Sequence, residues 1–95
     1  MIFEVLFTPE SEETFDAISQ HLLSEWGMKI VLEFQAEVSA RVKILSKSPF
    51  IYQVIDEALQ IRKCPIHRNC SIIYRIMEKK VEVICFWDNR QESLF

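Results

Sequence analysis

The spacing of apolar residues changes twice along the chain, and these changes predict the order of its secondary-structure elements. Residues 2–7 (IFEVLF) are rich in β-forming side chains and predict a first strand. Apolar residues then recur three or four positions apart, as on one face of a helix, up to Gly27 and again beyond it. Thr8 and Pro9 suit the start of the first helix, as a capping hydroxyl and as a proline at the first helical position. Gly27 suits its end, so the short break predicts an antiparallel hairpin of two helices, the second over about residues 28–46.

Each predicted helix has one apolar face, which we expect to be buried against a sheet. On the first helix this face carries Phe15, Ile18, Leu22 and Trp26. On the second helix it carries Val31, Phe34, Val38, Val42 and Leu45. Positive charge near the C-terminal end of the second helix suits the helix dipole and comes from Arg41, Lys43 and Lys47.

The remaining half of the chain predicts strands. Ser48–Pro49 ends the second helix, because a residue before proline avoids the helical conformation. The pattern over residues 50–57 is ambiguous and indicates a loop or a helical turn. Runs of β-forming residues then predict three strands, over about residues 58–64, 70–77 and 80–86. A tight turn at Glu78–Lys79 joins the last two. The predicted order is β-α-α-β-β-β, an α+β fold in which an antiparallel sheet has the helical hairpin packed on one face.

Alternation within the last two strands predicts which side chains share a face of the sheet. In the first of these strands, Ile72, Tyr74 and Ile76 lie opposite Ser71, Ile73, Arg75 and Met77. Both faces are largely apolar, so we expect this strand to be central, with Tyr74 in the core and its hydroxyl at the rim. In the last strand, alternation places Val81, Val83, Cys85 and Trp87 together, opposite Glu82, Ile84 and Phe86. We therefore expect Trp87 to pack on the helices, and the polar residues of the helix-free face to form the functional surface.

Length and charge narrow the class of protein. The chain has 95 residues, which predicts a single domain over residues 1–95. Its net charge is −3, whereas proteins that bind nucleic acid by general electrostatics are basic. Nucleic acid would therefore have to bind at a local basic patch. We interpret the first residues as a strand rather than a signal peptide, and no apolar run approaches the ~20 residues of a membrane span. These features predict a soluble, cytoplasmic protein with no membrane partner.

The cysteines predict neither a disulfide framework nor a metal centre. Three cysteines, an odd number without a secretion signal, argue against disulfides. Cys64, His67 and Cys70 form C-x-x-H-x-x-C, but zinc usually takes four protein ligands, or three and a water. The remaining thiol, Cys85, belongs to another predicted element. We therefore predict buried cysteines, a loop histidine, no metal site and no cofactor.

Four segments of the second half carry a family resemblance: LSKSP at 45–49, IRK at 61–63, IIYRI at 72–76 and FWDNRQ at 86–91. Their order and spacing resemble the RelE/ParE superfamily of bacterial toxins from type II toxin–antitoxin systems, some of them once described as plasmid stabilisation proteins. The resemblance covers nearly the whole chain, although each motif is degenerate by itself. It implies a β-α-α-β-β-β fold and a growth-inhibiting toxin. It also implies a partner, a cognate antitoxin that wraps and neutralises the toxin in a hetero-oligomer.

The resemblance implies two alternative activities. RelE-like members enter the ribosomal A site and cleave mRNA, whereas ParE-like members poison DNA gyrase without cleaving RNA. Metal-independent RNA cleavage needs groups that deprotonate the 2′-hydroxyl, stabilise the phosphorane and protonate the leaving oxygen. Arg62 and Arg90 match general positions of basic family residues, so the resemblance makes them the candidate catalytic residues. The candidates for binding nucleic acid or another target are Lys63, Arg68, Arg75 and Asn89.

The chain also departs from the ribonuclease pattern. Cys70–Ser71 stands where ribonuclease members carry arginine, no tyrosine follows Arg90, and no histidine follows the last strand. These departures favour a ParE-like toxin that acts on DNA gyrase or another essential target. A ribosome-dependent mRNA endoribonuclease is the alternative, and an inactive or purely protein-binding module is a further one.

Each arginine candidate also has a structural interpretation. Arg62 can be a strand-face charge paired with an acidic residue, and Arg75 can be on the solvent side of its strand. Arg90 can pair with Asp88 or Glu92, a contact that contributes little to stability when it is exposed.

Overall fold

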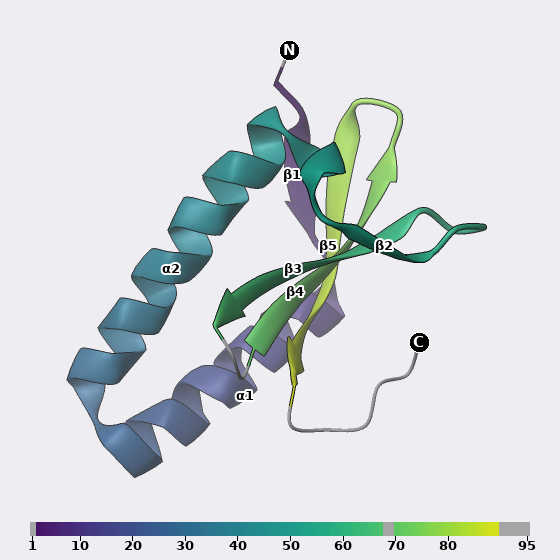
Figure 1. Ribbon diagram of the computed structural model, residues 1–95. Coiled ribbons are helices and arrows are strands. Elements are labelled where there is room, and N and C mark those ends of the chain that lie inside the picture. Colours follow the sequence, from purple (N-terminus) through teal and green to yellow (C-terminus); the bar gives the residue numbers. More distant parts are fainter. Residues whose placement is uncertain (1, 68–69, 90–95) are drawn as a thin grey trace.

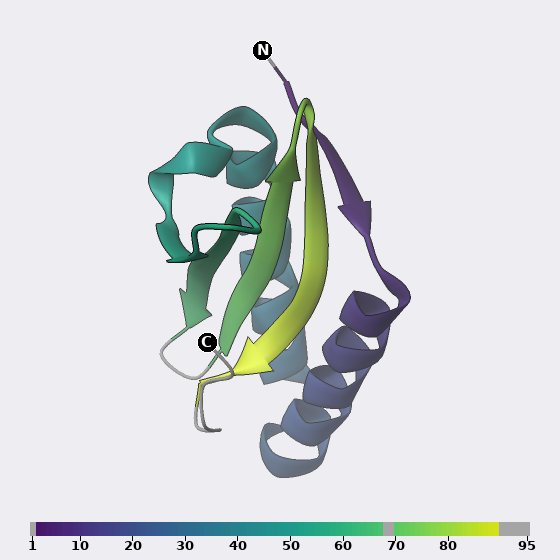
Figure 2. The same cartoon turned by 90° about the vertical axis from the view of Figure 1, so that its right-hand side faces the viewer.

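The computed structural model describes residues 2–67 and 70–89. Its elements in chain order are β1 (Glu4–Phe7), α1 (Pro9–Trp26), α2 (Met28–Lys47), the short 3₁₀ helix η1 (Pro49–Ile51), β2 (Gln53–Asp56), β3 (Ile61–His67), β4 (Cys70–Met77) and β5 (Lys80–Asp88). The strands form one sheet of order β1-β5-β4-β3-β2, and α1 and α2 pack as a hairpin on one of its faces (Figures 1 and 2). The predicted α+β class and helical hairpin are confirmed. None of the described helices has the length and apolarity that a membrane span requires.

Local sequence sets the ends of the helical hairpin. The Thr8 hydroxyl accepts a hydrogen bond from the Ser11 amide at 3.0 Å, which is the N-cap predicted for α1. Gly27 ends α1 with φ of +89°, a conformation that favours glycine, and its amide donates to the Leu23 carbonyl at 3.0 Å. Trp26, in the last turn of α1, is 71% exposed rather than buried, because the turn between the helices lies away from the sheet (Figure 1).

The main core lies between the helices and the sheet, and it uses the apolar faces predicted for both helices. Its helical members are Phe15, Ile18 and Leu22 of α1 and Val31, Phe34, Val38, Val42 and Leu45 of α2. The rings of Phe15 and Phe34 stack with centroids 5.5 Å apart, and Phe15 also contacts Phe86 of β5. Tyr74 of β4 is fully buried here, as predicted, and its hydroxyl donates to the Pro49 carbonyl at 2.6 Å. This hydrogen bond ties the central strand to the segment that follows α2.

The sheet is mixed rather than antiparallel throughout, as the sequence had predicted it to be, because β1 pairs with β5 in parallel. Glu4 lies opposite Lys80 and Phe7 lies opposite Val83. A parallel pair needs a long crossover connection, and most of the chain between these two strands, the helical hairpin included, supplies it. The apolar pattern of a strand is the same whether the strand pairs in parallel or antiparallel. The pattern therefore predicts the strands but not the parallel pairing of β1 with β5.

A fifth strand, β2, occupies part of the ambiguous segment 50–57 and pairs antiparallel with β3. The 3₁₀ helix η1 accounts for the helical turn that was the other interpretation of this segment. β3 begins at Ile61 rather than at residue 58, because the preceding residues turn the chain. In this turn the Leu59 amide donates to the Asp56 carboxylate at 3.1 Å, and Gln60 has φ of +55°.

A β-bulge interrupts the pairing of β4 with β5. Ile73 lies opposite Cys85, but the next residue of β4, Tyr74, lies opposite Val83. Ile84 is therefore the extra residue, and alternation restarts after it.

The bulge changes the face on which the end of β5 lies. Val81 and Val83 face the helices before the bulge, and Phe86 takes that face after it. Cys85 and Trp87 instead belong to a second cluster on the helix-free face, around Ile73. The predictions that Val81, Val83, Cys85 and Trp87 share a face, and that Trp87 packs on the helices, are therefore wrong.

Two threonines near the start of α1 supply hydrogen-bond partners for backbone groups of β5 that lie beyond the end of β1. The Thr8 hydroxyl donates to the Ile84 carbonyl at 2.7 Å. The Phe86 amide donates to the Thr14 hydroxyl at 2.9 Å. Because buried backbone groups need hydrogen-bond partners, these contacts stabilise the bulged conformation and anchor α1 to the sheet.

Candidate functional site

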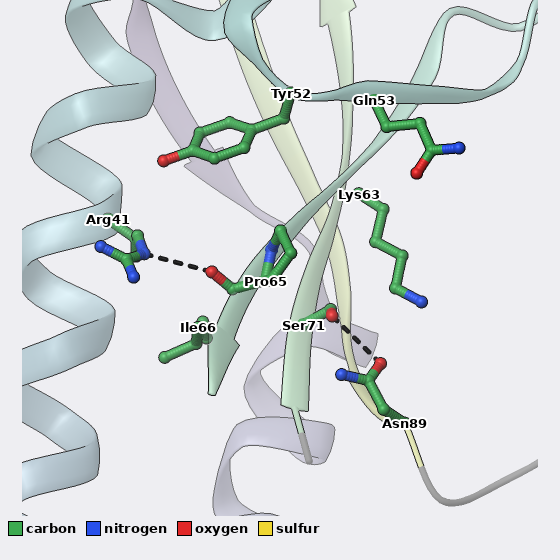
Figure 3. Close-up of a pocket in the computed structure, with 8 residues that line it drawn as sticks. All are labelled: Arg41, Tyr52, Gln53, Lys63, Pro65, Ile66, Ser71 and Asn89. Atoms are coloured by element: carbon green, nitrogen blue, oxygen red, sulfur yellow. Dashed lines mark hydrogen bonds between the residues drawn. The ribbon is translucent and has the colours of Figure 1, made fainter. Parts of the chain in front are cut away.

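Polar residues gather at the end of the sheet where β2 begins and β5 ends. They line an open pocket of about 660 Å³, which α2 borders on one side (Figure 3). The lining residues are Arg41, Tyr52, Gln53, Lys63, Pro65, Ile66, Ser71 and Asn89. The pocket thus combines side chains from α2, three strands and the residue after β5.

Arg41 reaches the pocket from α2 and fixes the helix to β3. Its position follows from the helical repeat, because it lies between the core residues Val38 and Val42 at the border of the buried face. Its Nε donates to the Pro65 carbonyl at 3.1 Å. Its guanidinium also lies 3.9 Å from the Glu37 carboxylate, one helical turn away, a distance at which an exposed pair contributes little.

Lys63 enters the pocket from β3. Its neighbour Cys64 belongs to the core under the helices, so alternation places Lys63 on the helix-free face. It lies opposite Gln53 of β2 and Ile73 of β4. Within residues 2–67 and 70–89, no carboxylate forms an ion pair with Lys63.

Asn89 enters the same pocket from the residue after β5. The hydroxyl of Ser71, which is fully buried at the start of β4, donates to the Asn89 Oδ1 at 3.0 Å (Figure 3). This contact fixes the amide beside the sheet. The structure therefore brings together Lys63 and Asn89, two of the four residues predicted to bind a target.

Arg75 lies on the same face as Lys63 but outside the pocket. It lies four positions beyond Ser71 along β4, a distance of about 13 Å in a strand. Its guanidinium forms a cross-strand ion pair with Glu82 of β5 at 3.1 Å. Both partners are about two-thirds buried, so this pair neutralises Arg75 in a partly desolvated setting.

Arg62 lies on the opposite face from Lys63. Its Nη1 donates to the carbonyl of Tyr52 at 2.8 Å and to that of Phe50 at 3.1 Å. Its guanidinium also lies 5.4 Å from the centre of the Phe50 ring, within the range of a cation–π contact. The structure therefore gives Arg62 a set of backbone partners in the η1–β2 segment and does not bring it to the pocket. Arg68 and Arg90, the other two predicted site residues, lie outside the described residues.

Burial raises the pKa values of both tyrosines and all three cysteines. The pKa of Tyr52 is raised by burial and by a hydrogen bond to Cys64, and burial also raises the pKa of Tyr74. Both hydroxyls are therefore protonated at neutral pH and can donate hydrogen bonds but not act as bases. Burial raises the pKa of Cys70 to about 12, that of Cys85 to about 11, and that of Cys64 above its usual range. Protonated thiols are poor nucleophiles and poor metal ligands.

No group of three or more metal-ligating side chains is assembled within the described part of the chain. Cys64 and Cys70 of the C-x-x-H-x-x-C motif both lie in the core under the helices. The side chain of His67 is outside the described set.

Of the eight described lining residues, the sequence predicted Lys63 and Asn89 as site residues and missed the other six, which include Arg41, Tyr52 and Gln53. Arg41 is interpreted from sequence as a charge that suits the helix dipole, and only the packing of α2 against β3 brings it to Pro65. Tyr52 and Gln53 fall in the segment whose pattern is ambiguous. A signal was available for Arg41, since a long cation at the border of a buried helical stripe often extends over the neighbouring element.

No protein-family model matches the chain, and no curated protein matches it significantly. Solved structures do match. The chromosomal ParDE TA (toxin–antitoxin) system from P. aeruginosa aligns with a TM-score of 0.77 at 18% identity, covering 92% of this chain and 96% of that one. The conserved hypothetical protein HP0894 from Helicobacter pylori aligns with a TM-score of 0.62 at 13% identity, covering 95% and 98%. The YoeB–YefM complex from Staphylococcus aureus aligns with a TM-score of 0.61 at 8% identity, covering 92% and 97%.

These likenesses extend over nearly the whole of each chain and concern the fold. The sequence resemblance to the RelE/ParE superfamily predicted such a fold, and the structural matches to the ParDE and YoeB–YefM structures confirm it. At these levels of identity the correspondence does not extend to individual site residues.

Proposed function

We propose that this protein is the toxin of a type II toxin–antitoxin system, that it works in the cytoplasm, and that it acts in the ParE-like manner on DNA gyrase or another essential target. The observation that carries the proposal is the fold, which the chain shares with the ParDE structure over 92% of its length at a TM-score of 0.77. The four sequence motifs of the second half support the same conclusion from a separate source.

A cognate antitoxin is the proposed partner. Solved structures similar to this chain include the ParDE TA system and a YoeB–YefM complex, so folds of this kind occur in a toxin–antitoxin system and in a complex of two proteins. The sheet also has exposed edges at β1 and β2, and unpaired strand edges are common sites of protein–protein contact.

The chemistry of the described residues supports target binding over RNA cleavage. Cleavage needs a base, an acid and stabilising cations around one phosphate. Arg62 is bonded to backbone carbonyls on the far face, and Arg75 is paired with Glu82. Tyr52 and Tyr74 have raised pKa values and are protonated. Lys63, by contrast, lies in the pocket, and no carboxylate within residues 2–67 and 70–89 forms an ion pair with it.

The proposal is tested by inducing the full chain in bacteria and following growth, DNA replication and translation. We expect growth arrest with blocked replication, and inhibition of gyrase supercoiling by the purified protein. Co-expression of the reading frame next to the gene should restore growth. The substitution Lys29→Ala, at an exposed position on α2 far from the pocket, is a control that should remain toxic. Normal growth together with uninhibited supercoiling would refute the proposal.

A second candidate function is ribosome-dependent mRNA cleavage. It is favoured by one observation, the convergence of Lys63, Ser71 and Asn89 in a single pocket. In that case the residues predicted from sequence would apply, with Arg62 and Arg90 as catalytic residues and Lys63, Arg68, Arg75 and Asn89 as RNA-binding residues. The RNA would then have to reach Arg62 on the opposite face of β3 from the pocket. Rapid loss of translation with cut mRNA, before any effect on replication, would select this function. Arg90→Ala should then abolish toxicity while the protein remains folded.

A further inference from the structure

Exposed apolar side chains gather at the tip of the helical hairpin. Trp26 and Met28 stand on either side of Gly27. Leu23, three residues before Trp26, and Leu32, four residues after Met28, lie on the same side of each helix one turn further from the tip. These four side chains, the tip patch, are 39–71% exposed. They are four of the ten large apolar side chains that the described part of the chain leaves exposed, and such patches mark interaction sites.

The two helices of the hairpin differ in charge. α1 has five acidic residues, and neither Lys nor Arg occurs in it. α2 has four Lys or Arg residues and two acidic residues. Within residues 2–67 and 70–89, the contact of Arg41 with Glu37 is the only ion pair that either helix makes. The exposed acidic residues of α1 and the exposed lysines of α2 are therefore free to pair with the charges of another molecule.

A second copy of the hairpin has the complementary arrangement. The outer face of the hairpin is the one that points away from the sheet, and Glu13 and Lys43 lie on it, opposite the buried stripes of α1 and α2. If two outer faces stack with their tips together, a twofold axis places α1 of each copy on α2 of the other. Glu13 and Lys43 then meet, because they lie at similar distances from Gly27, about 21 and 24 Å along their helices. The same axis brings the two tip patches into contact.

The outer face also has the shape and area that such a contact needs. Ala36 and Ala40, which lie between Leu32 and Lys43 on α2, are both exposed. Small side chains let a second helix approach to an interaxial distance of about 8 Å. With helices of 18 and 20 residues, pairing two outer faces would bury about 1,000 Å² in total. This area is at the lower end of specific interfaces, so the structure predicts a weak dimer.

We propose that two copies of this chain associate through the outer faces of their helical hairpins, with the tip patches in contact and α1 of each copy on α2 of the other. The four helices then form one bundle between the two sheets. The inference goes beyond the proposed function and does not depend on it. A chain that dimerises in this way without inhibiting growth would refute the toxin proposal alone.

Sedimentation velocity of the purified full-length chain measures the association. We expect a monomer–dimer equilibrium with a dissociation constant of about 10–100 µM. Trp26→Ala should raise this constant about tenfold or more, because aromatic residues dominate many interfaces. Leu32→Gln is a second variant in case the first disturbs folding, which circular dichroism verifies. Ile51→Ala, the matched change at another exposed apolar residue, should leave the constant unchanged.

Charge reversal tests the pairing of α1 with α2. Glu13→Lys places a lysine against Lys43 of the second copy, and Lys43→Glu places a glutamate against Glu13, and the twofold axis repeats each repulsion. Each variant alone should weaken dimerisation about tenfold. An equimolar mixture of the two should recover most of the parent affinity, because both contacts of the mixed dimer pair opposite charges. Lys79→Glu, in the turn between β4 and β5 at the other end of the molecule (Figure 1), is the matched control and should have no effect.

Several outcomes would overturn the inference. They are a monomer at every concentration up to about 500 µM, an unchanged dissociation constant in folded Trp26→Ala and Leu32→Gln, no recovery when the two charge variants are mixed, and equal weakening by Lys79→Glu. A chain that stays monomeric while the product of the neighbouring reading frame covers Trp26 would assign the tip patch to that partner and would also overturn it.

Discussion

Replacing Arg62 is the sharpest test of how the structure assigns roles to its basic residues. The guanidinium joins β3 to the η1–β2 segment through hydrogen bonds of 2.8 Å to the Tyr52 carbonyl and 3.1 Å to the Phe50 carbonyl, and it lies over the Phe50 ring. Arg62→Ala removes all three contacts at once. If this role is structural, the substitution should destabilise the fold whatever it does to activity.

The magnitude follows from the burial of each contact. The bond to Tyr52 is partly buried and contributes about 1.5 kcal/mol as a hydrogen bond from a charged donor. The bond to Phe50 is exposed and contributes about 0.5 kcal/mol, and the exposed cation–π contact contributes a similar amount. Arg62→Ala should therefore lower the free energy of unfolding by about 2–3 kcal/mol. For a domain of this size that corresponds to a decrease in Tm of roughly 10–20 °C.

Urea unfolding monitored by circular dichroism measures the change, with Lys63→Ala as the matched control. Lys63 is the next residue of the same strand on the opposite face, and it has no described ion pair, so its loss should change stability by less than about 0.5 kcal/mol. Arg62→Lys should recover only part of the lost stability, because an ammonium group lacks the planar fork that reaches both carbonyls. If Arg62→Ala unfolds within about 0.5 kcal/mol of the parent chain but abolishes growth inhibition, the structural assignment is wrong and the catalytic prediction is strengthened.

Three further predictions concern the core, the thiols and the helical hairpin. Tyr74→Phe leaves the buried Pro49 carbonyl without its 2.6 Å hydrogen bond and should cost about 1–3 kcal/mol in urea unfolding; an unchanged midpoint would contradict the role of this bond. Burial raises the folded-state pKa of Cys70 to about 12 and that of Cys85 to about 11, from the usual 9.0. The folded state therefore holds these protons more tightly than the unfolded state does. The free energy of unfolding should be constant below about pH 8 and should fall as the pH rises from about 9 to 12. Equal free energies of unfolding in urea at pH 7 and pH 10.5 would refute this prediction. Gly27→Ala places a Cβ in open space but at φ of +89° and ψ of 177°, so backbone strain alone should cost about 1–3 kcal/mol in thermal unfolding, and an unaltered Tm would argue against that conformation.

The sequence by itself determined the elements whose signals are local. The cap at Thr8, the break at Gly27 and the apolar stripe of α2 each depend on residues within one or two helical turns, and all three are present in the structure. The central position of β4 also followed from its pattern, because both of its faces are apolar. Helical periodicity and capping are short-range physics, so they can be identified before the fold is known.

The tertiary structure alone decided which face the end of β5 presents. Strict alternation puts Trp87 with Val83, and the inserted residue Ile84 separates them. The bulge is stabilised by Thr8 and Thr14, which lie more than 70 residues away in the sequence. No local pattern predicts such a contact, because the partner of a bulged backbone group is chosen by packing.

The residues of the candidate site also show which features local sequence determined and which the tertiary structure decided. From the sequence, Lys63 and Asn89 were identifiable as polar residues of late strands, but nothing in their spacing placed them in one pocket. That placement depends on the pairing of β3, β4 and β5, which also sets Arg62 on the far face with backbone partners of its own. Arg41 joined the pocket only because α2 packs beside Pro65. The sequence thus determined which side chains carry charge. The long-range pairing of strands and the packing of helices decided which of those side chains lie together. The reason is that proximity across a sheet depends on the register of the strands and not on separation along the chain.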